Sequence, residues 1–357
     1  MIALKAIGKN RFKSFLIFSS ITVSVMAIFL ITSISHGIIG MYSKMIKTDG
    51  DIIITQKGIA DNFFSNIDIS LMKKIDNING VQSSYAMIVG ASPINNIPIA
   101  GIYGTTSNHF SNYKLSSGEY PQKGEVILGA NLSRQIKSKK VNIGNKEFRV
   151  SGLFNSDIGF EEGGVVMNIE DAGELFSRSA SYILVSTTKS DKIKDLVKTI
   201  SQIDKDIEVK TTKSFIKEYN QFKIIENSSL VISALAFAMG LMGILSIMIM
   251  IVNSRKEEFG IMRAIGKSRF FIMKNLFFEV VFLSTSAYIF ALIISLIVLS
   301  IIPHIDMLQG YVNGSLSFTT SINVLIATIV MALLGSLIPA FIASKTDPVL
   351  LINQGSS

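Results

Sequence analysis

Four long stretches of this chain contain no charged side chain, and they constrain its fold more than any other feature. Each is about 20 residues or longer, and a helix of that length crosses the ~30 Å hydrocarbon core of a bilayer. A buried helix of a soluble protein is usually shorter and keeps a polar face. The pattern therefore predicts four transmembrane helices, at 14–36, 230–252, 280–302 and 322–343.

The first of these helices follows a basic segment, 1–13, with Lys5, Lys9, Arg11 and Lys13. A secretory signal peptide begins in the same way, but its apolar part spans only about 7 to 15 residues and ends at a small-residue cleavage site. The stretch here is longer, and no convincing cleavage site closes it. We therefore expect it to remain as a membrane anchor.

Basic residues between the helices indicate the orientation, because cytoplasmic flanks are enriched in Lys and Arg. Segment 253–279 carries six basic residues, whereas segment 303–321 carries none. The pattern places the N-terminal segment 1–13, the loop 253–279 and the tail 344–357 in the cytoplasm. Residues 37–229 and the short loop 303–321 then lie outside.

The same sorting accounts for the formal net charge of +8, because most of the excess lies in the cytoplasmic segments. The exported segment has nearly balanced charge and no basic stripe interleaved with aromatic residues, so nucleic-acid binding is not predicted. The chain has no cysteine, which excludes disulfides and thiolate metal or redox chemistry.

The exported segment 37–229 reads as mixed strand and helix. Alternating or apolar runs predict strands at 51–56, 125–129 and 164–169, and a hairpin with a Gly-Asn turn within 141–150. Apolar residues at helical spacing from Ile193 to Ile203 predict a helix. A further helix is predicted at 214–227 and leads into the second span. If the two are one continuous helix, it would act as a stiff lever between the exported domain and the membrane.

The sequence therefore predicts a membrane α-helical fold with four transmembrane helices. A mixed α/β extracytoplasmic domain is inserted between helices 1 and 2.

Residues that carry chemistry are sparse. His36, His109 and His304 are scattered, and no metal-ligand spacing or nucleophile turn is present. The pair Glu161-Glu162 is interpreted as part of a solvated loop, with a binding role as the alternative. We predict no catalytic, metal or cofactor-binding residue on this chain.

One segment partly matches a phosphate-binding loop, which needs four residues between its glycines, a strand before it and a helix after it. Gly260 and Gly266 precede Lys267 and Ser268, but five residues separate the glycines, and a predicted membrane helix lies upstream. Nucleotide binding by this segment is therefore not expected.

As a helix over 255–269, this cytoplasmic segment would place Phe259, Met262 and Ile265 on one side and charged residues around the rest. Such a helix suits docking against a partner protein. An amphipathic helix that rests on anionic lipid is the alternative that the residues leave open.

Four segments, in this order along the chain, resemble the FtsX-like and MacB-type permeases of ABC transporters. Two lie at the ends: Ala3-Leu-Lys-Ala-Ile-Gly-Lys-Asn-Arg-Phe-Lys-Ser14 and Pro339-Ala-Phe-Ile-Ala-Ser-Lys-Thr-Asp-Pro-Val-Leu350. The exported match is Gly118-Glu-Tyr-Pro-Gln-Lys-Gly-Glu-Val-Ile-Leu-Gly129 followed by Phe148-Arg-Val-Ser-Gly152. The cytoplasmic match is Arg255-Lys-Glu-Glu-Phe-Gly-Ile-Met-Arg-Ala-Ile-Gly266, which has Phe259 where the family commonly has Ile.

The resemblance implies a multi-pass protein of the bacterial cytoplasmic (inner) membrane with both termini inside. It implies a homodimer, or a heterodimer with a paralogue, that works with a separate cytoplasmic ABC ATPase holding ATP and Mg. Such a permease transmits ATP-driven motion to its extracytoplasmic domain. By the same resemblance, the ATPase-coupling residues are Glu257, Glu258, Phe259, Gly260, Met262, Arg263, Ala264 and Gly266.

The resemblance leaves the substrate open. Similar permeases export peptides or antibiotics, or extract lipoproteins and other hydrophobic cargo. Others activate a cell-wall hydrolase without transport, or export haem, and an extracytoplasmic adaptor is a further possible partner. His36, Met41 and Tyr42 near the end of the first span are weighed as a haem or hydrophobic-ligand site, against ordinary packing.

The charge pattern predicts the topology directly. A reporter fused after Ser107 should be extracytoplasmic, and one fused after Lys267 should be cytoplasmic, because the basic loop stays inside. Alkaline phosphatase and fluorescent-protein fusions measure this. Accessibility of Lys267 from outside would contradict the whole architecture.

Overall fold

The structure is a computed structural model that describes residues 11–59, 61–156, 158–188, 193–305, 314 and 316–345. The expected N-terminal segment 1–13 and tail 344–357 therefore fall almost wholly outside the described residues. The chain forms two compact units. We call 1–35, 227–301 and 314–357 the helical unit, and 36–226 with 302–313 the sheet unit.

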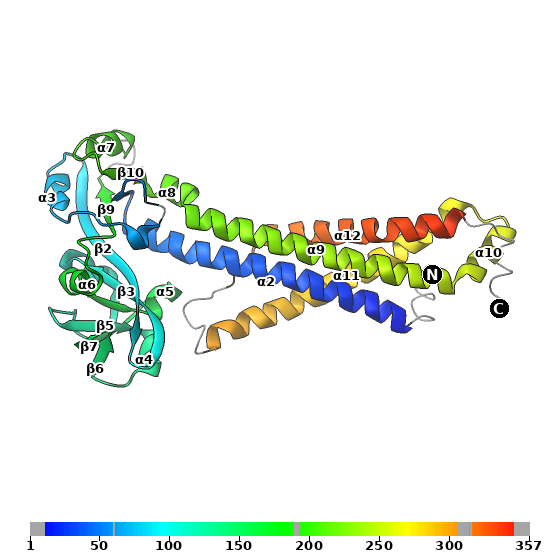
Figure 1. Cartoon of the computed structure of the whole chain (residues 1–357), viewed down its shortest axis with the longest axis horizontal. Coiled ribbons are helices and arrows are strands. Elements are labelled where there is room, and N and C mark those ends of the chain that lie inside the picture. The colour runs from blue at the N-terminus through cyan, green and yellow to red at the C-terminus, as the bar shows by residue number, and fades with distance from the viewer. Residues whose placement is uncertain are drawn as a thin grey trace. The chain divides into compact units, whose positions relative to one another are not determined.

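Within the described residues, four helices are long and apolar enough to cross a membrane (Figure 1). They are α2 (Arg11–Asp49), α9 (Asn220–Ser254), α11 (Arg269–Ile301) and α12 (Phe318–Lys345). The short α10 (Lys256–Ala264) lies between α9 and α11. The prediction of four membrane helices is confirmed, and most of these helices extend well beyond the uncharged stretches.

Several hydroxyl side chains inside the helical unit bond to their own helix. The hydroxyl of Thr22 donates to the Phe18 carbonyl oxygen at 2.7 Å, and that of Thr328 donates to the Val324 carbonyl oxygen at 2.7 Å. A bilayer core offers no water, so an unpaired polar group there is costly. These bonds let hydroxyl residues occupy membrane helices.

Small residues bring two of the long helices close together. A Cβ atom added to Gly240 of α9 would lie 2.9 Å from the Cβ atom of Ser24 in α2, and one added to Gly243 would overlap the Ser20 hydroxyl. Such a short distance between two helices is typical of membrane helices that pack through small residues. The two glycines therefore hold α9 against α2 of the same chain.

The sheet unit contains a ten-stranded mixed sheet among the described residues, in the order β10-β1-β9-β2-β3-β8-β5-β7-β4, with β6 paired to β2 and β7. β3 pairs with β8, and β5 with β7, in parallel, whereas the other pairs are antiparallel. The strands are β1 (Ile52–Gln56), β2 (Val81–Ile94), β3 (Ile97–Thr105), β4 (Lys114–Gly118), β5 (Glu125–Gly129), β6 (Lys140–Ile143), β7 (Lys146–Asn155), β8 (Val165–Asn168), β9 (Tyr182–Thr187) and β10 (Ile207–Thr211).

The helices of this unit cover both faces of the sheet. They are α3 (Leu71–Asp76), α4 (Ala130–Gln135), α5 (Gly159–Glu162), α6 (Ile169–Phe176), α7 (Ile193–Ile200) and α8 (Thr212–Glu218), with 3₁₀ turns at Asn62–Phe64, Ser107–Asn112 and Ile302–His304.

Successive residues of each strand divide between two apolar cores, because side chains alternate across a strand. Ile52 and Ile54 of β1 lie in a core with residues of α3, α6 and α7. Ile53 lies in the opposite core, together with Met45 and Ile46 from the last turns of α2. The outer end of the first membrane helix is therefore built into one face of the sheet.

Most predicted elements of this unit are confirmed. Strands occupy the stretches predicted at 51–56, 125–129 and 164–169, and α7 begins at Ile193. The hairpin of β6 and β7 turns at Gly144, whose φ of +57° suits glycine.

The continuous helix predicted at 214–227 is wrong. α8 ends at Glu218, α9 begins at Asn220, and Tyr219 between them has extended backbone, with φ −62° and ψ 119°. The polypeptide therefore turns at a single buried residue before the second membrane helix begins.

Packing of the Tyr219 side chain explains this break. Its ring stacks on Tyr42 and Phe215 and meets Phe222 edge-on, with centroids 5.7, 5.0 and 5.0 Å away. Its hydroxyl donates to Asp61 Oδ1 at 2.8 Å. Burial, with a smaller contribution from Asp61, raises the pKa of the Tyr219 phenol, so it remains a donor. We call Tyr42, Phe215, Tyr219 and Phe222 the aromatic cluster.

A larger side chain at Gly243 should destabilise the helical unit. Gly243→Val would force the branched side chain into the Ser20 hydroxyl, and overpacking costs about 1 to 3 kcal/mol. Gly40→Val is the matched control, since a Cβ atom there meets nothing within 4 Å. Thermal unfolding in detergent measures both, and equal midpoints would contradict the proposed packing.

Removal of the Tyr219 hydroxyl should loosen the break between α8 and α9. Tyr219→Phe keeps the ring but loses the bond to Asp61, a loss of about 1 kcal/mol because the half-buried carboxylate regains water. Hydrogen exchange of the α8 amides should rise about fivefold. Tyr120→Phe, which removes a bond to the Tyr113 carbonyl oxygen instead, should leave α8 exchange unchanged.

Candidate functional site

The cytoplasmic match predicted from sequence forms α10, whose two ends have clear local causes. Glu257 and Glu258 in the first turn suit the positive end of the helix dipole. At the other end, the Gly266 amide donates to the Arg263 carbonyl oxygen and the Lys267 amide to that of Met262, both at 3.0 Å. This is a Schellman motif.

Gly266 has a φ of +86° in this motif, a left-handed conformation that favours glycine. The helix predicted over 255–269 therefore ends at Ala264 instead. Gly266 was expected among the ATPase-coupling residues, and within this chain it ends the helix.

The apolar residues of α10 do not form the single side that the sequence predicted. Phe259 is buried in the core of the helical unit, Met262 is half-buried, and Ile265 is 70% exposed. The apolar contact of Phe259 is thus made with the chain itself, and it holds α10 against the membrane helices.

A different set of residues, in α10 and at its C-terminal cap, faces away from the core. Glu257, Ile261, Ala264 and Ile265 are exposed and follow one another at spacings of four, three and one residues, which places them along one side of a helix. Ile261 is 49% exposed. We call these four residues the outer stripe.

The remaining residues expected to couple fall between these two sides. Gly260 is buried, Glu258 and Arg263 are half-buried, and Gly266 is exposed. Arg263 extends along the helix end, where its Nη1 atom donates to the Lys267 carbonyl oxygen at 3.5 Å. The structure therefore divides the expected coupling residues into those packed within the chain, such as Phe259 and Gly260, and those exposed at its surface, such as Glu257 and Ala264.

Three charged residues meet where α9, α10 and α11 join. Arg255 Nη1 donates to Glu279 Oε2 at 2.9 Å, and Arg255 Nε donates to Glu258 Oε2 at 3.1 Å. The guanidinium also lies over the Phe259 ring, 5.2 Å from its centroid. The side chains of Arg255 and Glu279 are only 7% and 3% exposed. We call Arg255, Glu258 and Glu279 the Arg255 cluster.

Glu279 was missed by the sequence reasoning, which placed it at the end of the loop 253–279. The structure places it within α11, three turns into a candidate membrane span. One signal could have found it: a single acidic residue stands between Phe277-Phe278 and Val280-Val281. A charge in such surroundings needs a partner, and that partner is Arg255.

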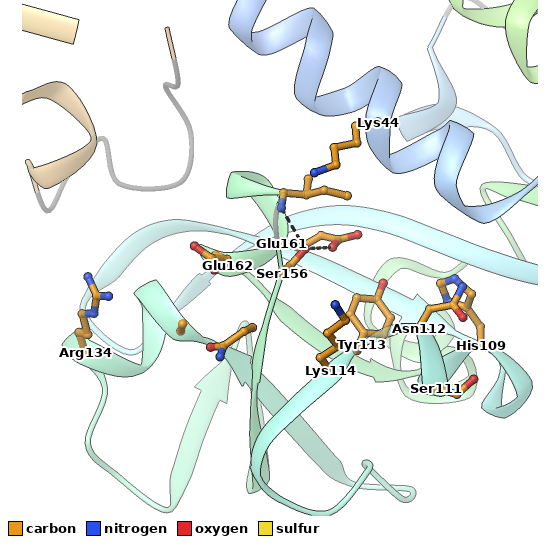
Figure 2. A pocket seen from close by; sticks show the side chains of 13 residues that line it. Lys44, His109, Ser111, Asn112, Tyr113, Lys114, Arg134, Ser156, Glu161 and Glu162 are labelled. Carbon is orange, nitrogen blue, oxygen red and sulfur yellow. Dashed lines mark hydrogen bonds between the residues drawn. The ribbon is translucent and has the colours of Figure 1, made fainter. Parts of the chain in front are cut away.

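A polar pocket of about 740 Å³ lies in the sheet unit (Figure 2). Its walls carry both signs of charge, with Lys44 of α2 pointing toward the α5 segment that holds Glu161 and Glu162. Glu161 was interpreted as part of a solvated loop, but it is buried in α5 and accepts a hydrogen bond from the Ser156 hydroxyl at 2.5 Å.

The other candidate ligands do not converge on one site. His36 is exposed, Met41 is buried, and Tyr42 belongs to the aromatic cluster. Among the described residues, no group of three or more His, Cys, Asp or Glu side chains could hold a metal ion.

Two family models match the chain. The MacB-like periplasmic core domain matches residues 14–203, more than half of the chain, and the FtsX-like permease C-terminal domain matches residues 230–348. Together they cover most of α2, the sheet unit up to residue 203, most of α9, and α10, α11 and α12, whereas β10 and α8 lie between the two matches.

Two relatives align with nearly the whole chain. An uncharacterized ABC transporter permease of Methanocaldococcus jannaschii is 22% identical over 97% of this chain and 95% of its own length. The macrolide export ATP-binding/permease protein MacB of Wolinella succinogenes is also 22% identical, over 98% of this chain but 60% of its own length. The chain thus spans about three fifths of that second relative.

Two solved structures resemble part of the chain. The periplasmic region of MacB from Actinobacillus actinomycetemcomitans superposes with a TM-score of 0.39 at 15% identity, covering 48% of this chain and 94% of that one. The extracellular domain of the noncanonic ABC-type transporter YknZ from Gram-positive bacteria gives 0.38 at 12% identity, covering 45% and 98%.

Proposed function

The chain belongs to the MacB/FtsX-type permeases of ABC transporters, and we propose that it transmits ATP-driven motion from a cytoplasmic ATPase to its sheet unit. Membership of this family implies an ATPase partner. We propose that the ATPase is a separate subunit, expected from a neighbouring gene, which supplies ATP and Mg²⁺. The permease would sit in the cytoplasmic membrane as a dimer, with α10 inside and the sheet unit outside.

The exposure of the outer stripe carries this proposal. Two isoleucines, Ile261 and Ile265, are 49% and 70% exposed on a helix whose other side is packed into the chain. Exposed apolar residues rimmed by charge are typical of protein docking surfaces. Glu257 and Lys267 supply charges at the two ends of the stripe.

The attachment of α10 supports a mechanical role. Phe259 anchors α10 in the core of the helical unit, and Arg255 joins it to α11 through Glu279. A force on the outer stripe would therefore act on the membrane helices instead of bending a free loop.

The helix α9 is a suitable element to carry such a force. It runs unbroken over the 35 residues Asn220–Ser254, a length of roughly 50 Å. Its first turn contributes Phe222 to the aromatic cluster on the sheet, and Arg255 follows its last residue. Motion at one end would reach the other with little loss, because a helix is stiff along its axis.

We propose export or extraction of a peptide, antibiotic, lipoprotein or other hydrophobic cargo as the outcome of this motion. The alternatives are activation of a cell-wall hydrolase without transport, and haem export. Cargo that stimulates ATP hydrolysis by the assembled complex would favour transport. Stoichiometric capture of one extracytoplasmic enzyme would favour signalling.

A charge within the outer stripe should release the ATPase. Ile265→Asp places a carboxylate in the apolar contact, and disruption of such a contact costs about 2 kcal/mol or more, or about thirtyfold in affinity. Because Ile265 is 70% exposed, the fold should be unaffected. Co-purification of the ATPase with matched amounts of wild-type and variant permease measures the effect.

Ile99→Asp is the matched control, since Ile99 is 62% exposed in β3 of the sheet unit. It should leave co-purification unchanged. If α10 instead rests on anionic lipid, Ile265→Asp would weaken membrane contact and leave ATPase capture intact. That result would overturn the docking role.

A further inference from the structure

We propose that Arg255 is an exchangeable latch: it shares its guanidinium between Glu258 and Glu279 in the free permease and pairs with Glu279 alone when the ATPase takes Glu258. This inference rests on the proposed function and names the residues that connect docking to the membrane helices. Of the three residues, only Glu258 belongs to the set that the family resemblance implied.

The position of Arg255 in the chain suits this role. It is the residue between α9 and α10, and its backbone, with φ −118° and ψ 15°, belongs to neither helix. Its side chain bonds forward to Glu258 in α10 and across to Glu279 in α11. A change in its pairing would therefore alter how three helices are joined.

Two carboxylates share the guanidinium of Arg255, and they differ in burial. Glu279 is almost fully buried and depends on Arg255, since a buried charge without a partner is strongly destabilising. The Glu258 side chain is 34% exposed and can reach another protein. Glu258 is thus the carboxylate that can leave at the lower cost.

The second oxygen of Glu279 supplies the replacement bond. Among the described residues, its Oε1 atom is buried and has no hydrogen-bond partner. Arginine and a carboxylate commonly form two parallel bonds, and such paired bonds are the stronger arrangement. When Glu258 moves to a basic group on the ATPase, the freed guanidinium can take this oxygen, so that docking leaves no buried charge unpaired.

A static ion pair would behave differently. It would hold α10 in place, but it would stabilise the free and the ATPase-bound permease equally and so would not change the affinity for the ATPase. The exchange predicts instead that Glu279, which is too deeply buried to contact the ATPase, affects the affinity for the ATPase.

The first measurement is ATPase affinity. The permease in lipid nanodiscs is titrated with the purified ABC ATPase of the neighbouring gene. Glu279→Gln keeps the shape but offers only a neutral acceptor to the freed guanidinium, so capture should be about tenfold weaker than for the wild type. Ser284→Ala, a buried substitution in the same helix α11, should leave affinity unchanged.

Arg255→Lys is the second variant, in case Glu279→Gln disturbs folding. It keeps the charge but replaces the fork by a single ammonium group, which cannot make the parallel pair of bonds. Capture should again be about tenfold weaker. Affinity within twofold of the wild type in both variants would overturn the exchange.

The second measurement needs no ATPase. Hydrogen exchange of the α10 amides in the permease alone should be about tenfold faster or more in Glu279→Gln, because α10 loses its tie to α11. Unchanged exchange would overturn the latch itself. A wild-type permease that captures no ATPase would overturn the proposed function and the exchange, while faster α10 hydrogen exchange in Glu279→Gln would still show that Arg255 ties α10 to α11.

Discussion

The lack of water inside a bilayer governs how the helical unit of this chain is built. Backbone groups must pair within helices, hydroxyl side chains such as Thr22 and Thr328 bond back to their own helix, and apolar side chains can face outward without penalty. Close packing then depends on small residues, which is why Gly240 and Gly243 meet α2. The same constraint requires that any charge admitted to a membrane helix bring its own partner. Glu279 meets that requirement through Arg255, and so the junction of α9, α10 and α11 is fixed by electrostatics and not only by packing.

The sheet unit follows a different rule: successive side chains of its strands alternate between two apolar cores, one on each face of the sheet. One of those cores is completed by side chains from the last turns of α2, from α8 and from the first turn of α9. The last turns of α2 and the first turn of α9 therefore belong to the sheet unit, where the aromatic cluster and the Tyr219–Asp61 bond hold the break between α8 and α9.

Periodicity and charge were enough to predict the four membrane helices, the mixed domain between the first two, and most of its strands, because these follow from local sequence. Apart from the end of α10, where Gly266 is a local signal, the features that sequence could not supply depend on contacts between distant residues. Helical spacing grouped Phe259 with Ile265, but only the fold shows that Phe259 packs into the helical unit while Ile265 is exposed. Nothing local distinguishes Tyr219 from a helical residue, since its extended backbone is imposed by Tyr42 and Asp61. Glu279 lay next to a loop in the sequence, and its partner is 24 residues away.

These contacts favour docking against a partner over the lipid-resting alternative that the sequence left open for α10. A helix that rests on lipid needs its apolar side free to enter the interface, with its charged side toward water. In α10 the largest apolar residue, Phe259, is buried in the core of the helical unit, and the guanidinium of Arg255 lies over its ring. What remains exposed is a narrow stripe with Glu257 at one end and two isoleucines beyond it. A firmly anchored helix with a small apolar stripe is instead suited to fit a groove in a partner, and in the proposed mechanism its anchoring through Arg255 would pass motion of the stripe to α9 and α11.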